Sequence, residues 1–282
     1  MAVKPGRPNG GSTMDTSIQP HNQRPAAVWS SGGAAYDEIS RQIASGLEHC
    51  VRRLDPKPGE RILDLATGTG WTSRLLAGRG AKVTGVDIAA DLIAAAKMNG
   101  QSQGLAIDYE LGDAEQLRFT DGEFDAVVST FGVMFASRPE LAASEMARLC
   151  SKGGRIALTT WRPDSNVFEM FKVMRSYMPA PPSPSAPSPF AWGKRERIEE
   201  LFGSNFRLQF EEGETIYYDR SGEAVWEAFV TGYGPTKSLA ASLDDRRRED
   251  LKRDFIAFHN SFASPLGVSM PRQYLLAVGT RL

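Results

Sequence analysis

Cysteine is scarce in this chain, and long apolar stretches are missing. The two cysteines, Cys50 and Cys150, stand beside apolar residues and lack the short spacing of redox or zinc motifs. We therefore predict two reduced, buried thiols, with no disulfide framework and no metal site. No apolar stretch approaches the roughly 20 residues that a membrane-spanning helix needs, and the first residues lack the apolar core of a secretory signal. The expected location is the cytoplasm.

An excess of either charge is also missing. Lys and Arg number 33 and Asp and Glu number 34, which leaves a net charge of −1. Nucleic acids and anionic membranes attract strongly basic surfaces, so this balance argues against both as partners. The densest charged block, residues 244–250, mixes both signs and is interpreted as a solvated helix face. A small molecule is the expected partner, and homodimer formation is left open.

Large apolar residues are nearly missing from residues 1–25, which are rich in Gly, Pro, Ser, Asn and Gln. Such a segment cannot bury enough apolar surface to fold by itself. We predict a disordered N-terminal arm over 1–25, and we assign no role to His21. The remaining residues, 26–282, are long enough for one large domain with a sizeable core.

The stretch from Arg61 to Trp71, R-I-L-D-L-A-T-G-T-G-W, joins a short apolar run to a glycine-rich turn. The apolar run suits a strand buried on both faces of a parallel sheet. Gly68 and Gly70 allow a tight turn because they carry no Cβ, and a helix is predicted to follow. Such a unit presents free backbone N–H groups at the carboxyl end of its strand, where nucleotide-like ligands bind.

Three acidic residues mark the ends of three successive predicted strands: Asp64, Asp87 and Asp113. Asp87 follows the first glycine by about 20 residues, the usual place for an acceptor to ribose hydroxyls. A carboxylate such as Asp64 repels a pyrophosphate but suits a ligand that carries an ammonium and a sulfonium. Ser73 also stands where the dinucleotide fingerprint needs its third glycine. The pattern favours S-adenosylmethionine over NAD.

At these residues the chain resembles the class I S-adenosylmethionine-dependent methyltransferases, and most closely their ubiquinone/menaquinone-biosynthesis-type small-molecule branch. The family motif acid-x-Gly-x-Gly-x-Gly is matched by Asp64, Ala66, Gly68 and Gly70, with alanine in place of the first glycine. Similarity continues through residues 83–87, 112–114, 124–129 and 153–160. It covers roughly residues 34–161, so it says little about the segments that choose a substrate.

The resemblance implies a cofactor site for S-adenosylmethionine. Asp64 is expected near the methionyl amino group, Asp87 at both ribose hydroxyls, and Asp113 at the adenine amine. The other expected contacts come from Ala66, Gly68, Gly70, Ile88, Ala114, Ser129 and Phe131.

Strand-like and helix-like segments alternate along the chain. Strands are predicted at 61–66, 82–87, 106–111, 124–130, 155–161, 206–219 and 273–280. Apolar residues at helical spacing predict one helix over 36–54 and another over 238–262. The predicted fold is α/β, with a doubly wound, mostly parallel, seven-stranded sheet of Rossmann-like type. Residues 162–203, which include a proline-rich stretch at 179–189, are expected to form a helical lid inserted after the fifth strand.

The pocket for a methyl acceptor is predicted to be apolar and aromatic. Its candidate residues are Trp29, Tyr36, Met134, Trp161 and Trp192. No catalytic residue is evident; Tyr36 and His259 are the candidates, although both positions also suit core packing. Transfer from a sulfonium releases a neutral thioether, so alignment of the reactants supplies much of the acceleration.

Three functions follow from these residues. The first is methyl transfer from S-adenosylmethionine to a small, partly apolar metabolite. The second, which the missing base keeps open, is an S-adenosylmethionine-binding protein without catalysis, or one that uses the sulfonium as a structural or electrostatic group. The third is an NAD-dependent oxidoreductase, which Ser73 and Asp64 disfavour. The acceptor and the methylated atom stay open.

Overall fold

The computed structural model describes residues 18–180 and 188–282. Within them, eight strands form one sheet in the order β3-β2-β1-β4-β5-β8-β6, and β7 pairs only with β8. Strands β1 to β5 pair in parallel, whereas β8 runs antiparallel to β5 and β6. The strands are β1 (Arg61–Leu65), β2 (Lys82–Asp87), β3 (Ile107–Leu111), β4 (Phe124–Thr130), β5 (Cys150–Trp161), β6 (Phe206–Asp219), β7 (Ala263–Ser264) and β8 (Gly267–Arg281).

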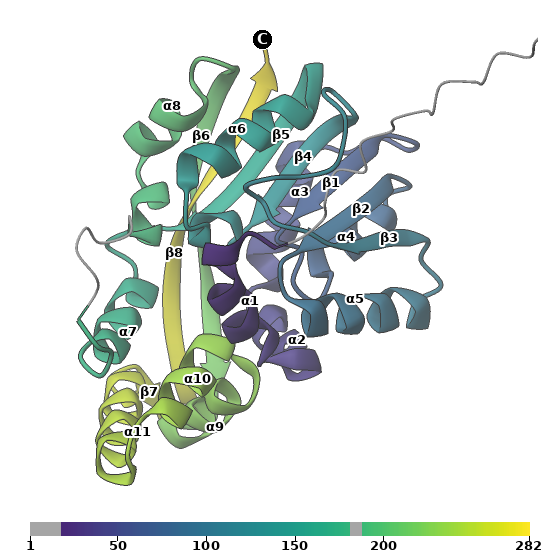
Figure 1. Cartoon of the computed structure of the whole chain (residues 1–282). Helices are drawn as coiled ribbons and strands as arrows, with labels where there is room; N and C mark the ends of the chain where they lie inside the picture. The colour runs from purple at the N-terminus through teal and green to yellow at the C-terminus, as the bar shows by residue number, and fades with distance from the viewer. Residues whose placement is uncertain (1–17, 181–187) are drawn as a thin grey trace, which may run out of the picture.

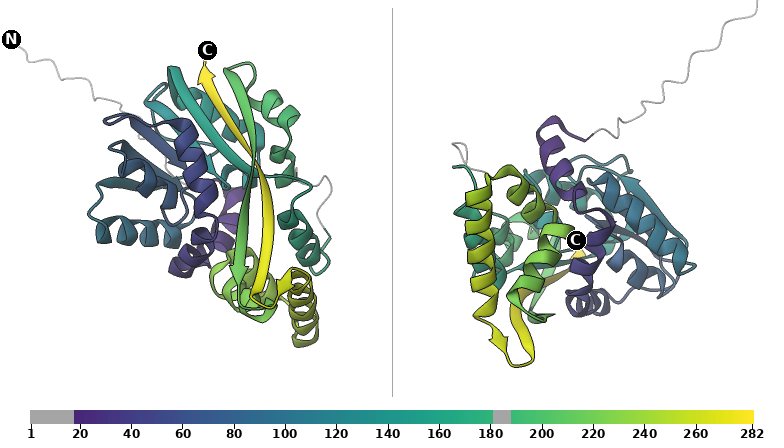
Figure 2. Two further views of the ribbon diagram at one scale, coloured as in Figure 1. Left: turned by 180° about the vertical axis from the view of Figure 1, so that it is seen from behind. Right: turned by 90° about the horizontal axis from the view of Figure 1, so that it is seen from below.

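Helices cover both faces of this sheet, with α3 on one face and α6 on the other (Figures 1 and 2). The helices are α1 (Gln23–Ser30), α2 (Tyr36–Arg41), α3 (Ala44–Leu54), α4 (Trp71–Ala77), α5 (Ala90–Ser102), α6 (Pro139–Leu149), α7 (Asn166–Arg175), α8 (Arg195–Phe202), α9 (Gly222–Gly232), α10 (Gly234–Ser242) and α11 (Asp245–Asn260). Short 3-10 turns occur at η1 (Pro20–Asn22), η2 (Gly33–Ala35), η3 (Val133–Phe135) and η4 (Pro189–Gly193).

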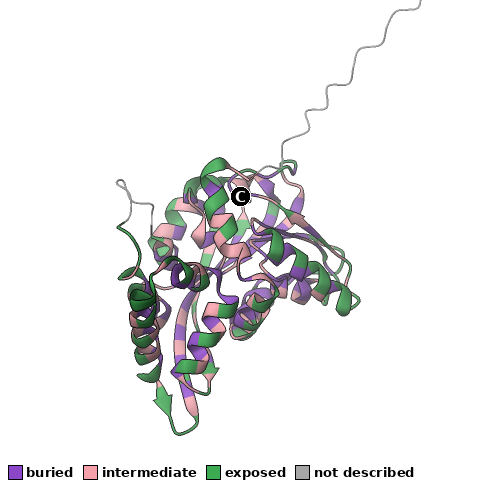
Figure 3. Cartoon of the chain, turned by 60° about the horizontal axis from the view of Figure 1, so that its bottom comes forward, coloured by how far each residue is buried: buried purple, intermediate pink, exposed green. Residues whose placement is uncertain are grey.

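The sheet is the centre of the hydrophobic core. Ile62, Leu63 and Leu65 of β1 are at most 1% exposed, as expected for a parallel strand that is covered on both faces. The central strands are buried, while exposed residues lie on the outer faces of the helices (Figure 3). The predicted α/β class with its doubly wound, mostly parallel sheet is confirmed, and β7 adds a two-residue strand to the seven predicted ones.

Part of the predicted N-terminal arm is folded. Residues 18–25 are ordered, because Pro20–Asn22 form η1 and α1 begins at Gln23. Composition misled the prediction here, since the segment is held mainly by polar contacts and Asn22 is only 3% exposed. The prediction for residues 1–17 lies outside the described residues, as does that for 181–187 of the proline-rich stretch.

Both long predicted helices are broken in two. The first divides into α2 and α3 at Gln42 and Ile43, where the Gln42 carbonyl accepts a hydrogen bond from the Arg272 side chain at 2.5 Å. The second divides into α10 and α11 at Leu243, and the Asp244 side chain caps α11 by accepting from the Arg247 N–H at 2.8 Å. Local periodicity cannot reveal such breaks, because a distant side chain or a cap decides them.

Helices α9, α10 and α11 form a separate layer at one end of the molecule (Figure 1). They pack on one another and on the ends of β6 and β8, which extend beyond the parallel strands. Among the described residues, no helix combines the length and the apolarity required to cross a bilayer.

Candidate functional site

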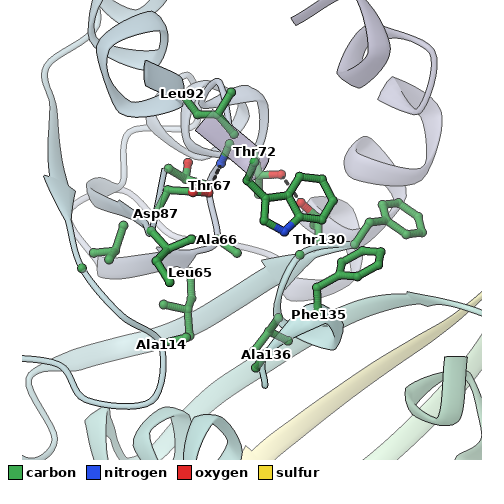
Figure 4. Close-up of a pocket in the computed structure, with 18 of the residues that line it drawn as sticks. Leu65, Ala66, Thr67, Thr72, Asp87, Leu92, Ala114, Thr130, Phe135 and Ala136 are labelled. Atoms are coloured by element: carbon green, nitrogen blue, oxygen red, sulfur yellow. Dashed lines mark hydrogen bonds between the residues drawn. The ribbon is translucent and has the colours of Figure 1, made fainter. Parts of the chain in front are cut away.

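A pocket of about 970 Å³, including its open mouth, lies at the carboxyl ends of β1, β2 and β4. This is the edge at which ligands bind in open α/β sheets. Nine of the residues predicted for the site line it: Trp29, Tyr36, Ala66, Gly68, Asp87, Ile88, Asp113, Ala114 and Phe131. Figure 4 shows the Asp87 and Ala114 side of the pocket facing Phe135 across the cavity.

Asp87 ties the end of β2 to the glycine-rich loop. Its Oδ2 accepts from the Gly68 N–H at 2.8 Å, and its Oδ1 accepts from the Ala89 N–H at 2.9 Å. Burial raises the pKa of Asp87, although these backbone donors oppose the rise. Each carboxylate oxygen has a second lone pair, so Asp87 can hold the loop and still accept from hydroxyl groups in the pocket.

The glycine loop approaches its neighbours too closely for most side chains. A Cβ on Gly70 would lie 2.3 Å from the Tyr109 hydroxyl oxygen, and the backbone there is left-handed with φ of +81°. Gly70 therefore lets α4 begin at Trp71 but does not itself line the pocket. Ala66 also adopts a positive φ, +57°, in the place where the family motif has glycine.

Asp64 is not in the pocket, contrary to its expected place beside the cofactor's amino group. Its side chain is buried behind the loop, where Oδ2 accepts from the Thr67 hydroxyl at 2.6 Å and the Ser73 hydroxyl at 2.7 Å. Oδ1 has no partner among the described residues. Burial raises the pKa of Asp64 to about 6, and the two hydroxyl groups limit the rise. Asp64 is a positioning residue that fixes the loop.

Asp113 reaches the pocket, but the N-terminal segment already binds its carboxylate. The Asn22 side-chain amide donates to Oδ2 at 2.9 Å and to Oδ1 at 3.2 Å. The Gln19 backbone N–H adds a bond to Oδ2 at 3.1 Å. Beside this contact, His21 Nε2 lies 2.7 Å from Glu115 Oε2. The predictions missed Asn22, because a polar residue in a polar segment gives no sequence signal.

Aromatic side chains of α1, α2 and η3 form part of the pocket wall. The Trp29 ring lies 5.0 Å from that of Phe135 and 5.6 Å from that of Tyr233, and Tyr36 stacks on Tyr233 at 6.2 Å. Burial, and then the nearby Asp87 charge, raise the pKa of Tyr36. Tyr36 therefore stays protonated near neutral pH, where it can donate a hydrogen bond but cannot serve as a base.

Other predicted residues lie behind the pocket wall. Trp161 stacks on Phe131 with 4.0 Å between the ring centroids, and the Ser129 hydroxyl accepts from the Val133 N–H at 3.0 Å. Met134 and Trp192 are each 1% exposed and belong to the core. These four side chains support the wall instead of lining it.

His259 is also away from the pocket. It is fully buried in α11, with Nδ1 2.8 Å from the Phe255 carbonyl oxygen. Burial lowers the pKa of His259 to about 4. The structure thus places this catalytic candidate among the aromatic side chains of α9 and α11.

The cover of the pocket comes from a different segment than expected. Asn22, Pro25 and Trp29 of the N-terminal segment line it, whereas residues 162–180 and 188–203 contribute no lining residue. The described part of the predicted lid instead supports the wall, since Phe171 of α7 stacks on Phe135 with centroids 6.0 Å apart.

Trp71 is a pocket residue that sequence reasoning missed. Its indole Nε1 is buried and has no hydrogen-bond partner among the described residues. Nearby, the hydroxyl groups of Thr72 and Thr130 lie 2.6 Å apart and join α4 to β4 (Figure 4). An unpaired donor at a pocket wall is expensive unless a ligand accepts from it. In the sequence, the position of Trp71 directly after the glycine loop could have indicated that it lines the pocket.

Comparisons with known proteins agree with this arrangement. A family model described as a methyltransferase domain matches residues 63–158. The Mycobacterium tuberculosis protein Rv1405c is 33% identical over 224 residues, covering 78% of this chain and 80% of the relative. The ubiquinone/menaquinone biosynthesis C-methyltransferase UbiE of Rubrivivax gelatinosus is 33% identical over 166 residues, covering 54% of this chain and 64% of that one.

A solved structure shares the fold. Phosphoethanolamine N-methyltransferase 2 of Haemonchus contortus, in complex with S-adenosyl-L-methionine, superposes with a TM-score of 0.53 at 19% identity. The superposition covers 84% of this chain and 52% of that chain. The chain belongs to the class I S-adenosylmethionine-dependent methyltransferases, which confirms the resemblance found in its sequence.

Proposed function

We propose that the protein transfers a methyl group from S-adenosylmethionine to a small, partly apolar metabolite by in-line displacement. One observation carries this proposal: a single pocket joins the Asp87 carboxylate and the glycine loop to an aromatic wall. The first half suits a nucleoside and the second suits an apolar acceptor.

The residues present fit the cofactor of this family. Asp87 would accept from the ribose hydroxyls, while Ile88 and Ala114 would pack against the adenine. The Gly68 backbone would pass beneath the ribose and methionyl portion. The Trp71 Nε1–H would donate to the methionyl carboxylate, which would satisfy a donor that has no partner among the described residues.

S-adenosylmethionine supplies the methyl group and a neutral thioether leaving group. The contribution of the protein is alignment, which can lower a barrier by roughly 7–11 kcal/mol. Phe131 and Tyr36 restrict where the acceptor can lie, and the protonated Tyr36 hydroxyl can orient a polar atom on it. Aromatic faces also stabilise a nearby cationic sulfur.

Two other functions make different predictions. A non-catalytic or sulfonium-using S-adenosylmethionine-binding protein would bind the cofactor but add no methyl group to any acceptor. An NAD-dependent oxidoreductase would bind NAD in preference. Residue 73 is serine, whereas a dinucleotide fingerprint needs glycine there, and its hydroxyl donates to Asp64. This argues against the oxidoreductase.

Calorimetric binding of S-adenosylmethionine, S-adenosylhomocysteine and NAD tests the cofactor assignment. Wild type should bind the first two, and Asp87→Ala should lose at least about tenfold in affinity for both. Asp108→Ala is the matched control, because Asp108 is an exposed carboxylate on β3 outside the pocket. Binding of NAD alone would contradict the proposal.

A screen for methyl acceptors then tests the reaction. Small apolar compounds are incubated with the protein and S-adenosylmethionine, and products are sought by the mass gain of one methyl group. Asp87→Ala should abolish product formation at limiting cofactor, while Asp108→Ala should not. Cofactor binding without a methylated product from a broad apolar library would favour the non-catalytic alternative.

A further inference from the structure

Arg272 of β8 is a buried cation that the proposed reaction does not yet use. Arg272 is 4% exposed, and burial lowers the pKa of its guanidinium to about 10. The guanidinium lies 5.1 Å from the centroid of the Tyr217 ring and 5.7 Å from that of Trp161. One Nη donates to the Gln42 carbonyl oxygen at 2.5 Å.

The hydrogen-bonding capacity of this guanidinium is largely unused. It carries five N–H donors, yet Nε has no partner among the described residues. Aromatic faces attract the charge but accept no strong hydrogen bonds. The carboxylate of Asp219 accepts from the Tyr217 hydroxyl at 3.1 Å, so it is engaged elsewhere. A buried charge without an ionic partner is costly, and an anionic ligand would remove that cost.

The strand register places Arg272 at the ligand-binding edge of the sheet. Tyr274 of β8 pairs with Trp161, the last residue of β5. Arg272 lies two residues beyond Tyr274, just past the carboxyl end of β5. It therefore occupies the same edge at which the pocket opens.

Arg272 does not itself line the pocket, because two stacked rings lie between its guanidinium and the cavity. Phe131 lines the pocket and stacks on Trp161, whose ring in turn faces the guanidinium. On a second path, Gln42 binds Arg272 and lies between Ser40 and Ile43. Both of these line the pocket. For a ligand in the acceptor half to reach the guanidinium, the Phe131 and Trp161 rings have to rotate aside.

We propose that Arg272 recognises the carboxylate of the methyl acceptor, which makes the acceptor an apolar or aromatic carboxylic acid. This rests on the proposed function, since it assigns the acceptor half of the same pocket. The guanidinium fork matches the planar carboxylate, with Nε–H as one donor of a bidentate pair. The apolar body of the acid packs against the Phe131 and Phe135 rings of the pocket wall.

Benzoate and its neutral isostere benzamide test the assignment on the full chain saturated with S-adenosylhomocysteine. Titrations are followed by calorimetry for wild type, Arg272→Met and Arg272→Lys. Arg207→Met is the control, because Arg207 is exposed on β6 and the substitution changes the net charge equally. S-adenosylhomocysteine is titrated separately into each protein.

Wild type and Arg207→Met should bind benzoate at least about tenfold more tightly than benzamide. Arg272→Met should lose that preference, and Arg272→Lys should keep part of it. Affinity for S-adenosylhomocysteine should be equal in all four proteins. If wild type does not bind S-adenosylhomocysteine, the proposed function is refuted, whatever the result for Arg272. If wild type binds benzoate and benzamide equally, or binds neither, this result alone overturns the role of Arg272.

Discussion

Asn22 and Asp113 lie 91 residues apart in the chain and meet through one side-chain amide. Its nitrogen donates to both carboxylate oxygens, at 2.9 and 3.2 Å, and its own carbonyl oxygen accepts from the Ser137 hydroxyl at 2.6 Å. Helix α1, which follows directly, contains no fully buried side chain. Polar contacts thus hold the segment that precedes α1, and such elements open more readily than core elements do.

Asn22→Ala should loosen this segment. A hydrogen bond to a charged group contributes about 1.5–3 kcal/mol, so amide exchange over α1 should accelerate by about tenfold or more. Hydrogen–deuterium exchange followed by mass spectrometry measures this directly. S-adenosylhomocysteine should also dissociate faster from the variant, because Asn22 and Asp113 both line the pocket.

Gln19→Ala is the matched control for that experiment. Gln19 binds Asp113 through its backbone N–H, which the substitution keeps. Among the described residues, its side chain binds only the exposed Gln116. Exchange over α1 should therefore change little. Equal exchange in Asn22→Ala and wild type would show that the ring contacts of Trp29 hold the segment instead.

Ala66 and Gly132 form a second close pair, between the loops after β1 and β4. A Cβ on Gly132 would lie 2.5 Å from the Ala66 Cβ and 2.9 Å from its carbonyl oxygen. Gly132 has φ of −110°, which any residue can adopt, so close approach alone requires glycine there. Ala66 stands where the family motif has its first glycine, and Gly132 on the neighbouring loop leaves the space that the Ala66 Cβ occupies.

Gly132→Ala should destabilise the protein by about 1–3 kcal/mol through overpacking. Ala66→Gly should stabilise it by about 1 kcal/mol, because the left-handed backbone at residue 66 then carries no Cβ. In the double variant the cost of Gly132→Ala should fall by at least about 0.5 kcal/mol. The rescue should be partial, since the Ala66 carbonyl oxygen remains. Strict additivity in urea unfolding of the four proteins would contradict this pairing.

Much of the sheet could be predicted, because apolar strands between turn residues are local signals. The predicted bounds 82–87 and 124–130 coincide with β2 and β4. The pocket residues at the ends of these strands followed, including Asp87 and Phe131. Parallel strands have their carboxyl ends at one edge of the sheet. Residues that directly follow such strands in the sequence can therefore be predicted to lie close together.

What could not be predicted depends on contacts between distant segments. Asn22 binds a carboxylate 91 residues away, and Arg272 binds Gln42 across 230 residues. Asp64 could not be placed either, because a strand-end acid can turn toward the ligand or toward the loop. The neighbouring Thr67 and Ser73 hydroxyls turned it toward the loop.

His259→Asn should leave methyl transfer intact. The buried ring lies outside the pocket, and an asparagine amide can still donate to the Phe255 carbonyl oxygen. With an acceptor found by the screen, kcat/KM should stay within about twofold of wild type. Tyr36→Phe is the comparison, and it should lower kcat/KM further because the Tyr36 side chain lines the pocket. A folded His259→Asn protein with kcat/KM reduced about a hundredfold would restore His259 as a catalytic candidate.

Asp64 should make the stability of the protein depend on pH in a defined direction. Its pKa of about 6 in the folded protein exceeds the ordinary value of 3.8. The folded state therefore holds an extra proton between these values, and the stability from Asp64 is lost as pH rises through this window. Asp64→Asn should remove the effect, because an amide does not titrate while its oxygen can still accept from the Thr67 and Ser73 hydroxyls.

Urea unfolding of wild type and Asp64→Asn near pH 5 and near pH 7.5 tests this dependence. From the lower to the higher pH, wild type should lose about 1.4 kcal/mol relative to the variant. Asp125→Asn is the control: hydrogen bonds from Arg61, first from its backbone N–H, lower the pKa of Asp125, so this group titrates below the window. Its stability difference from wild type should be the same at both pH values. A constant difference for Asp64→Asn as well would mean that Asp64 is already ionised near pH 5, and that the two hydroxyl groups outweigh its burial.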